Sequence, residues 1–251
     1  PQVDRAAAVA EKIQEFNKES ADELDKEVDV DTAAKKASLK SRYQAFMKKA
    51  NTTLRKVAKT QKETRAKFDA VYDSINSSLD TLVGDPLTLA FQTSQLIQSP
   101  ALVLDNVRAR LDAYRDLATS IFNGDGAAVT DNNDFRSDDN LALNYVAGTV
   151  ESVVNAQFET KSDALTAAEE ALQLLSDATA WRDGQLTDLG EVDSGAAYQK
   201  IQEAVALAAG YLVEISFTLK QERAITLARP RTIIDLAAEL YGEVDERLDF
   251  L

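Results

Sequence analysis

With 251 residues, 45 % of them hydrophobic, the chain is long enough to bury a sizeable core, and its formal net charge is −14. It has no cysteine and no histidine, which excludes disulfides, thiolate zinc sites and histidine-based acid–base catalysis. Nine glycines and four prolines are too few turn residues for a β-sandwich, and no apolar run approaches the roughly 20 residues that span a bilayer. We therefore expect an all-α protein of long amphipathic helices, without a membrane segment, cofactor, metal or enzymatic activity.

Two helices of different charge are predicted in residues 1–83. From residue 3 to about residue 24, apolar residues recur every three or four positions, as on one face of an amphipathic helix. The helix stops and restarts near residues 29–32, where Asp31 or Thr32 is suited to be an N-cap. The same spacing then continues to residue 82, apart from a polar gap at 58–67. We interpret 1–83 as a charged helical hairpin or coiled-coil arm, with the acidic first helix beside the basic second helix.

Glycine, proline and polar clusters divide the rest of the chain into shorter helices. The predicted helices are residues 87–98, 101–122, 140–181 as one helix or two, 196–227 and 233–240. The predicted breaks are Gly84-Asp85-Pro86, Ser99-Pro100, a polar loop at 123–139, a Gly/Asp-rich loop at 183–195, and Arg229-Pro230, after which Thr232 caps the last helix. We group these helices into a helical body (84–182) and a C-terminal helical unit (195–251). The single tryptophan, Trp181, is interpreted as a packing anchor.

Positive charge is concentrated in one segment. Residues 1–31 hold ten acids and four bases, residues 32–68 hold one acid and twelve bases, and the remaining residues hold 31 acids and twelve bases. Three interpretations are open: pairing with an acidic helix of the same chain or of another subunit, docking on an acidic protein partner, and binding of nucleic acid. Nucleic acid is the least favoured, because aromatic residues do not alternate with the lysines as in single-strand binders. The candidate interaction residues of this segment are Lys35, Lys36, Lys40, Arg42, Lys48, Lys49, Arg55, Lys56, Lys59, Lys62, Arg65 and Lys67.

Acidic residues gather in the polar loop, where Asp125, Asp131, Asp134, Asp138 and Asp139 offer oxygen ligands to a calcium ion. An EF-hand requires acids at alternate positions, a central glycine and a terminal glutamate, and this spacing does not match. We therefore interpret the segment as a solvated loop.

The C-terminal region is the most distinctive part of the sequence. It contains the run Arg229-Pro230-Arg231-Thr232-Ile233-Ile234-Asp235-Leu236-Ala237-Ala238-Glu239-Leu240-Tyr241-Gly242. Residues 215–251 resemble the C-terminal region of the DNA-circularization (DNA circulation) proteins of Mu-like tailed bacteriophages, and residues 84–120 are similar to the helical middle of that family. The resemblance implies a virion structural protein at the junction of tail tube and baseplate, made in the bacterial host cytoplasm, with hub, tube and tape-measure proteins as partners. It implies no catalysis on DNA, and it adds Arg229, Arg231 and Tyr241 to the candidate interaction residues.

Two other functional classes remain open. The run from Thr232 to Gly242 is also similar to the first helix of LysM-like modules, which implies peptidoglycan binding by a module on a helical stalk. The composition is compatible as well with a cellular helical scaffold or adaptor unrelated to phage. The long amphipathic helix with its polar gap further predicts a homo-oligomer, such as a ring or a trimer. Because the chain starts at Pro1 rather than at methionine, we expect it to be an excerpt or a trimmed form of a longer chain.

Overall fold

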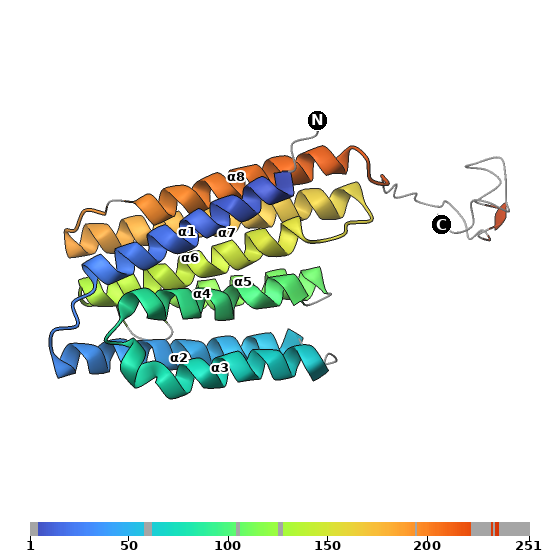
Figure 1. Cartoon of the computed structure of the whole chain (residues 1–251). Coiled ribbons are helices and arrows are strands. Elements are labelled where there is room, and N and C mark those ends of the chain that lie inside the picture. The colour runs from blue at the N-terminus through green and yellow to red at the C-terminus, as the bar shows by residue number, and fades with distance from the viewer. Residues whose placement is uncertain are drawn as a thin grey trace. The chain divides into compact units, whose positions relative to one another are not determined.

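The structure is a computed structural model that describes residues 5–57, 62–103, 106–124, 128–193 and 195–221, together with positions 232, 234 and 235. Within these residues it contains eight α-helices and no strand, which confirms the predicted all-α fold (Figure 1). The helices are α1 (Arg5–Glu27), α2 (Ala33–Val57), α3 (Lys62–Leu82), α4 (Pro86–Val103), α5 (Val107–Phe122), α6 (Asn132–Val154), α7 (Lys161–Leu189) and α8 (Ala196–Ser216). None of these helices is long and apolar enough to cross a membrane. The chain divides into two compact units, 1–220 and 221–251, so the boundaries expected near 84 and 195 both lie inside the first unit.

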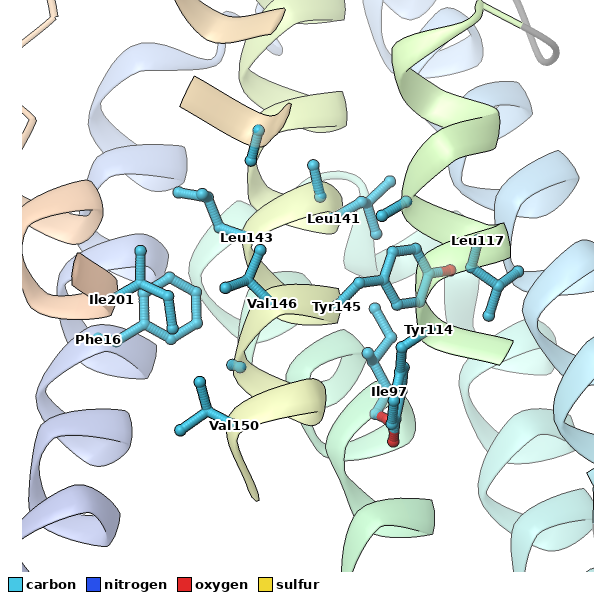
Figure 2. Close-up of a cluster of buried hydrophobic side chains, with 14 of the residues drawn as sticks. Phe16, Ile97, Tyr114, Leu117, Leu141, Leu143, Tyr145, Val146, Val150 and Ile201 are labelled. Atoms are coloured by element: carbon cyan, nitrogen blue, oxygen red, sulfur yellow. The ribbon is translucent and has the colours of Figure 1, made fainter. Parts of the chain in front are cut away.

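Helix α6 is the centre of the first unit, because it packs against α1, α2, α4, α5, α7 and α8. Twenty of its 23 residues are buried. Figure 2 shows Val146 on the side of Phe16 and Ile201, whereas the ring of Tyr145 points toward Tyr114. A helix that is covered on every side also buries its polar residues, so α6 brings charged groups into the core.

Gly148 allows α5 to lie close against α6. A Cβ atom at this position would stand 2.7 Å from Cζ of Tyr114, which is closer than a real Cβ contact. The Tyr114 side chain is fully buried, and its hydroxyl donates to the carbonyl oxygen of Ile97 on α4 at 2.7 Å. One tyrosine thus joins three helices at the position where the central helix has no side chain.

The hairpin predicted for residues 1–83 is present in a different form. Its arms are α2 and α3, the two halves of the segment predicted as one long helix, whereas α1 lies against α8, α4 and α6 (Figure 1). Helix α2 ends at Val57, immediately before the polar gap at 58–67, and α3 begins at Lys62, within that gap. Folding back at this gap lets both halves bury their apolar stripes, which one straight helix would carry beyond the core. The acidic first helix and the basic second helix are therefore not the two arms of one hairpin.

Two predicted breaks are helical instead. Helix α4 continues through Pro100, a residue that removes the backbone donor for the carbonyl oxygen of Leu96, and the hydroxyl of Ser99 donates to that oxygen at 3.4 Å. Helix α7 continues through the expected loop at 183–195 as far as Leu189 and ends at Gly190, whose φ of 68° is the left-handed conformation that favours glycine.

The structure contradicts the prediction that the acidic segment is a solvated loop, and this correction has the greater consequence. Asp131 is the N-cap of α6, and its side chain accepts a hydrogen bond from the backbone N–H of Asp134 at 2.9 Å. The following residues are the first turns of a buried helix rather than a loop in water. The expected helical region at 140–181 is thus the remainder of α6 followed by α7, which begins after the N-cap Thr160.

The remaining local predictions concern Trp181 and the end of the chain. Trp181 is buried, with its ring 5.8 Å from that of Phe122 and 5.8 Å from that of Phe135, which confirms a packing anchor. Helix α8 ends at Ser216, earlier than predicted. In the second unit, the backbone N–H of Asp235 donates to the hydroxyl of Thr232 at 3.2 Å, as expected of a cap. The rest of the helix predicted at 233–240 lies, apart from residues 234 and 235, outside the described residues.

Candidate interaction surface

Helix α2 carries most of the candidate interaction residues. Its apolar positions form one buried stripe: Leu39, Tyr43, Met47, Ala50 and Leu54. All eight charged residues of the helix are basic, and they are distributed around the sides and the outward face. Because the buried stripe fixes how the helix is rotated, it decides which basic residues face the protein and which face solvent.

Arg42 faces the protein and joins α2 to α6. Its guanidinium lies 2.9 Å from Asp134 and 2.5 Å from Asp138, and all three side chains are about 10 % exposed. It also donates to the carbonyl oxygen of Ala128 at 2.9 Å. Burial raises the pKa of Asp138 to about 6, although the guanidinium of Arg42 opposes that rise. Arg42 therefore has a structural partner on the central helix.

A second group of basic residues pairs with carboxylates beside α2. Lys40 lies 2.5 Å from Asp80, and Arg55 lies 3.1 Å from Asp69, so both ends of α2 are tied to α3. Arg65 of α3 lies 3.9 Å from Asp69, one turn further along its own helix. Lys35 pairs with Asp29 in the connection that precedes α2. The acidic partners of the basic segment thus come from this connection, from α3 and from α6.

The third group faces solvent. Lys36, Lys48, Lys56 and Lys62 are exposed, and none of them has an ion-pair partner in the described part of the chain. Lys49 is exposed as well. The remaining candidates, Lys59, Arg229, Arg231, Tyr241 and the side chain of Lys67, lie outside the described residues. Sequence reasoning therefore combined two kinds of residue, those that hold α2 in place and those that remain available for a partner.

A cleft of about 590 Å³ runs beside the basic helix, between α2, α5 and the start of α6. Its lining combines the charged residues Arg42, Lys49, Asp134 and Asp138 with small and apolar ones. Phe46 forms part of the wall, and its ring stacks on Tyr145 of the central helix with 5.3 Å between the ring centroids. In this cleft Arg42 already pairs with Asp134 and Asp138. We therefore interpret the cleft as a contact between helices.

A second ion-pair network on the far side of α6 was not found from the sequence. Arg182 of α7 donates to Asp139 through Nε at 2.6 Å and through Nη2 at 3.0 Å, and it also pairs with Asp193. Arg136 of α6 lies 2.7 Å from Asp193 and 2.5 Å from Glu27 of α1. Burial acts to raise the pKa of Asp193, but the two arginines outweigh it and the pKa is lowered. This network connects α1, α6, α7 and the connection before α8.

The candidate calcium ligands are distributed among these structural contacts. Asp131 caps α6, Asp134 and Asp138 bind Arg42, and Asp139 binds Arg182. Asp125 lies outside the described residues. In the part of the chain with assigned positions, no group of three or more Asp, Glu, His or Cys residues is arranged to hold a metal ion. Arginine guanidinium groups pair with three of these carboxylates, Asp134, Asp138 and Asp139.

Comparison with known proteins adds no relative. No protein-family model, curated protein or solved structure matches the chain. The fold and the surface together define an all-α protein whose buried charges join helices and whose outermost basic helix keeps exposed lysines.

Proposed function

We propose that the chain is a non-enzymatic structural protein of a bacteriophage tail, placed where the tail tube meets the baseplate, and that it docks on acidic neighbours through its basic face. The observation that carries this proposal is the outward face of α2, where Lys48 and Lys56 are exposed and have no ion-pair partner among the described residues. Lysines that do not pair within the chain are available to a partner.

The distribution of charge favours an acidic protein as that partner. The α2–α3 hairpin, residues 33–82, contains twelve bases and four acids, whereas the rest of the chain contains 16 bases and 38 acids. A long polyanion such as DNA would meet the acidic remainder as well as the basic hairpin, and the acidic remainder would repel it. A folded acidic protein can contact the hairpin alone. Complementary charge of this kind mainly increases association rate and specificity.

The use of the buried carboxylates supports a structural role. Strongly shifted pKa values often mark catalytic groups, and burial raises the pKa of Asp138 and of Asp139. Each of these carboxylates is held by an arginine from another helix, Asp138 by Arg42 and Asp139 by Arg182. We therefore interpret these two buried carboxylates as groups that join helices around α6, and their shifted pKa values as a consequence of that burial.

The assignment to a phage tail is supported by the sequence resemblance to the DNA-circularization proteins. One of the two resembling segments, residues 84–120, corresponds to α4 and most of α5. These helices lie between the central helix and the basic hairpin, because α4 packs on α3 and α6, and α5 packs on α2 and α6. Residues 84–120 therefore form the layer that packs directly against the basic hairpin.

Cryo-electron microscopy of purified phage tail ends tests the proposal. We expect density for this chain at the junction of tube and baseplate, with the outward face of α2 against an acidic neighbour. Particles assembled with the variant Lys48→Glu/Lys56→Glu should contain less of the chain than particles with Lys18→Glu/Lys26→Glu. The latter pair is the matched control, because Lys18 and Lys26 are exposed on α1, also eight positions apart. Mature particles without the chain would refute the tail assignment and leave a cellular scaffold as the better description.

A further inference from the structure

Helices α2 and α7 have outward faces of opposite charge. On α2 the exposed ionisable residues without an ion-pair partner include Lys48 and Lys56, and the helix contains no acid. On α7 the exposed ionisable residues include Glu169, Asp177 and Asp183, and its two bases are Lys161 in its first turn and Arg182, which is buried. None of these three carboxylates forms an ion pair with another described residue.

The charges on the two faces have the same spacing. Lys48 and Lys56 are eight positions apart, as are Glu169 and Asp177. Eight residues of an α-helix correspond to about 12 Å along the axis and a rotation of about 80°, so each pair lies on one side of its helix with the same separation. Two lysines on one helix can therefore oppose two carboxylates on the other at the same time.

Small residues are exposed beside the charges on both helices, and on α7 the exposed Leu172 and Gln173 lie between Glu169 and Asp177. Ala45 and Thr52 are exposed on α2, and Ser176 and Ala180 are exposed on α7. Small side chains let two helices approach closely while longer charged side chains pair along the edges.

Within one copy the two faces do not meet. Helix α2 packs on α3, α5 and α6, whereas α7 packs on α5, α6 and α8, so α5 and α6 lie between them (Figure 1). Contact between the faces of α2 and α7 therefore requires two copies. Because the two surfaces differ, such a contact is heterologous, and its repetition produces a ring or an open filament.

We propose that the outward face of α2, at Lys48 and Lys56, binds the outward face of α7, at Glu169 and Asp177, of a second copy, so that copies join head to tail. The inference rests on the proposed docking role of α2 and identifies the acidic neighbour as another copy of this chain. Since these side chains are exposed, the association depends on ionic strength.

Sedimentation velocity of the full chain tests the inference. Between about 500 mM and about 25 mM NaCl the Debye length grows from about 4 Å to about 20 Å. At the higher salt we expect a monomer of 27.4 kDa, and at the lower salt multiples of that mass. Lys48→Glu/Lys56→Glu and Glu169→Lys/Asp177→Lys should each weaken association at low salt at least about tenfold, because each places like charges opposite one another. The control Lys18→Glu/Lys26→Glu has the same charge change on α1 and should associate like the wild type.

The fourfold variant that carries both reversals is the decisive sample. It restores opposite charges across the proposed contact with the signs exchanged, so we expect it to associate again. A monomeric wild type at low salt, a fourfold variant that stays monomeric although folded, or equal loss of association in the α1 control would each overturn the inference. These results can be told apart from a failure of the tail assignment. If the chain is monomeric but its α2 variant is lost from particles, the proposed function stands and the self-association is wrong. If the chain self-associates but is absent from particles, the proposed function is wrong.

Discussion

Glu151 provides a sensitive test of how the central helix tolerates charge. It is mostly buried on α6, and its Oε2 atom has no hydrogen-bond partner among the described residues. Burial raises its pKa from an ordinary value of 4.5 to about 7. The folded protein therefore keeps this proton at pH values where the unfolded chain has already lost it. We expect Glu151→Gln, which removes the charge at nearly constant shape, to stabilise the protein at neutral pH.

The magnitude and the sign follow from the two pKa values. At about 1.4 kcal/mol for each pH unit, the difference between 4.5 and about 7 amounts to about 3 kcal/mol. Below pH 4.5 the buried Glu151 does not lower the free energy of unfolding of the wild type. This free energy falls as the pH rises from 4.5 to about 7, and Glu151 lowers it no further above about pH 7. The free energy of unfolding of Glu151→Gln should thus exceed that of the wild type by a gap that opens across this window to about 3 kcal/mol.

Urea unfolding followed by circular dichroism, at closely spaced pH values from about 4 to about 8, measures this gap. Subtracting wild type from variant at each pH cancels the other titrating groups, including Asp138. The control Glu11→Gln changes an exposed glutamate of α1 and should give a small difference that does not grow across the window. A difference for Glu151→Gln that is constant with pH, or that narrows as the pH rises, would refute the reasoning.

Two further predictions concern the packing around α6. Gly148→Ala should lower the free energy of unfolding by about 1–3 kcal/mol, because the new methyl group meets the fully buried ring of Tyr114. The control Gly184→Ala in α7 should raise this free energy by about 0.5–1 kcal/mol, because a Cβ atom there would meet no neighbouring atom within 4 Å. Thermal and urea unfolding of both variants measure the two signs, and stabilisation by the first would contradict the close approach of α5. Arg182→Met should lower the free energy of unfolding by about 3–5 kcal/mol at pH 7, because buried Asp139 loses its partner and Asp193 keeps only Arg136. Arg115→Met changes an exposed arginine of α5 and should alter it by under about 1 kcal/mol. Similar losses for the two arginine variants would show that burial of the network contributes little.

Local signals in the sequence predicted much of the helical structure. Apolar spacing located the helices, and the cap at Thr232 was recognisable from residue type alone. The break between α2 and α3 was not, because apolar spacing continues with the same period on both sides of it. Helix α4 likewise runs through Pro100 although proline usually marks a helix end, since the chain supplies the hydroxyl of Ser99 to the carbonyl concerned.

The interaction surface and the buried networks depend on pairs that are distant in the sequence. Segment 131–139 has the composition of a solvated loop, yet residues 134–139 are buried, and Arg42 and Arg182 reach their carboxylates from other helices. Composition therefore identified α2 as basic, but the rotation of that helix decided that Arg42 is internal and that Lys48 is exposed. Such a division requires knowledge of which helices are neighbours.

The contact between α1 and α8 places a condition on synthesis of the chain. Arg5 near the start of α1 lies 3.0 Å from Glu214 near the end of α8, so the first described helix is completed by the last helix of its unit. With roughly 190 residues between the end of α1 and the end of α8, and roughly 5–20 residues added per second, the ribosome needs about 10–40 s to supply that partner. During this interval the apolar stripe of Val9, Ile13 and Phe16 lacks part of its final cover. A chaperone that binds exposed apolar helices could bind α1 during this interval.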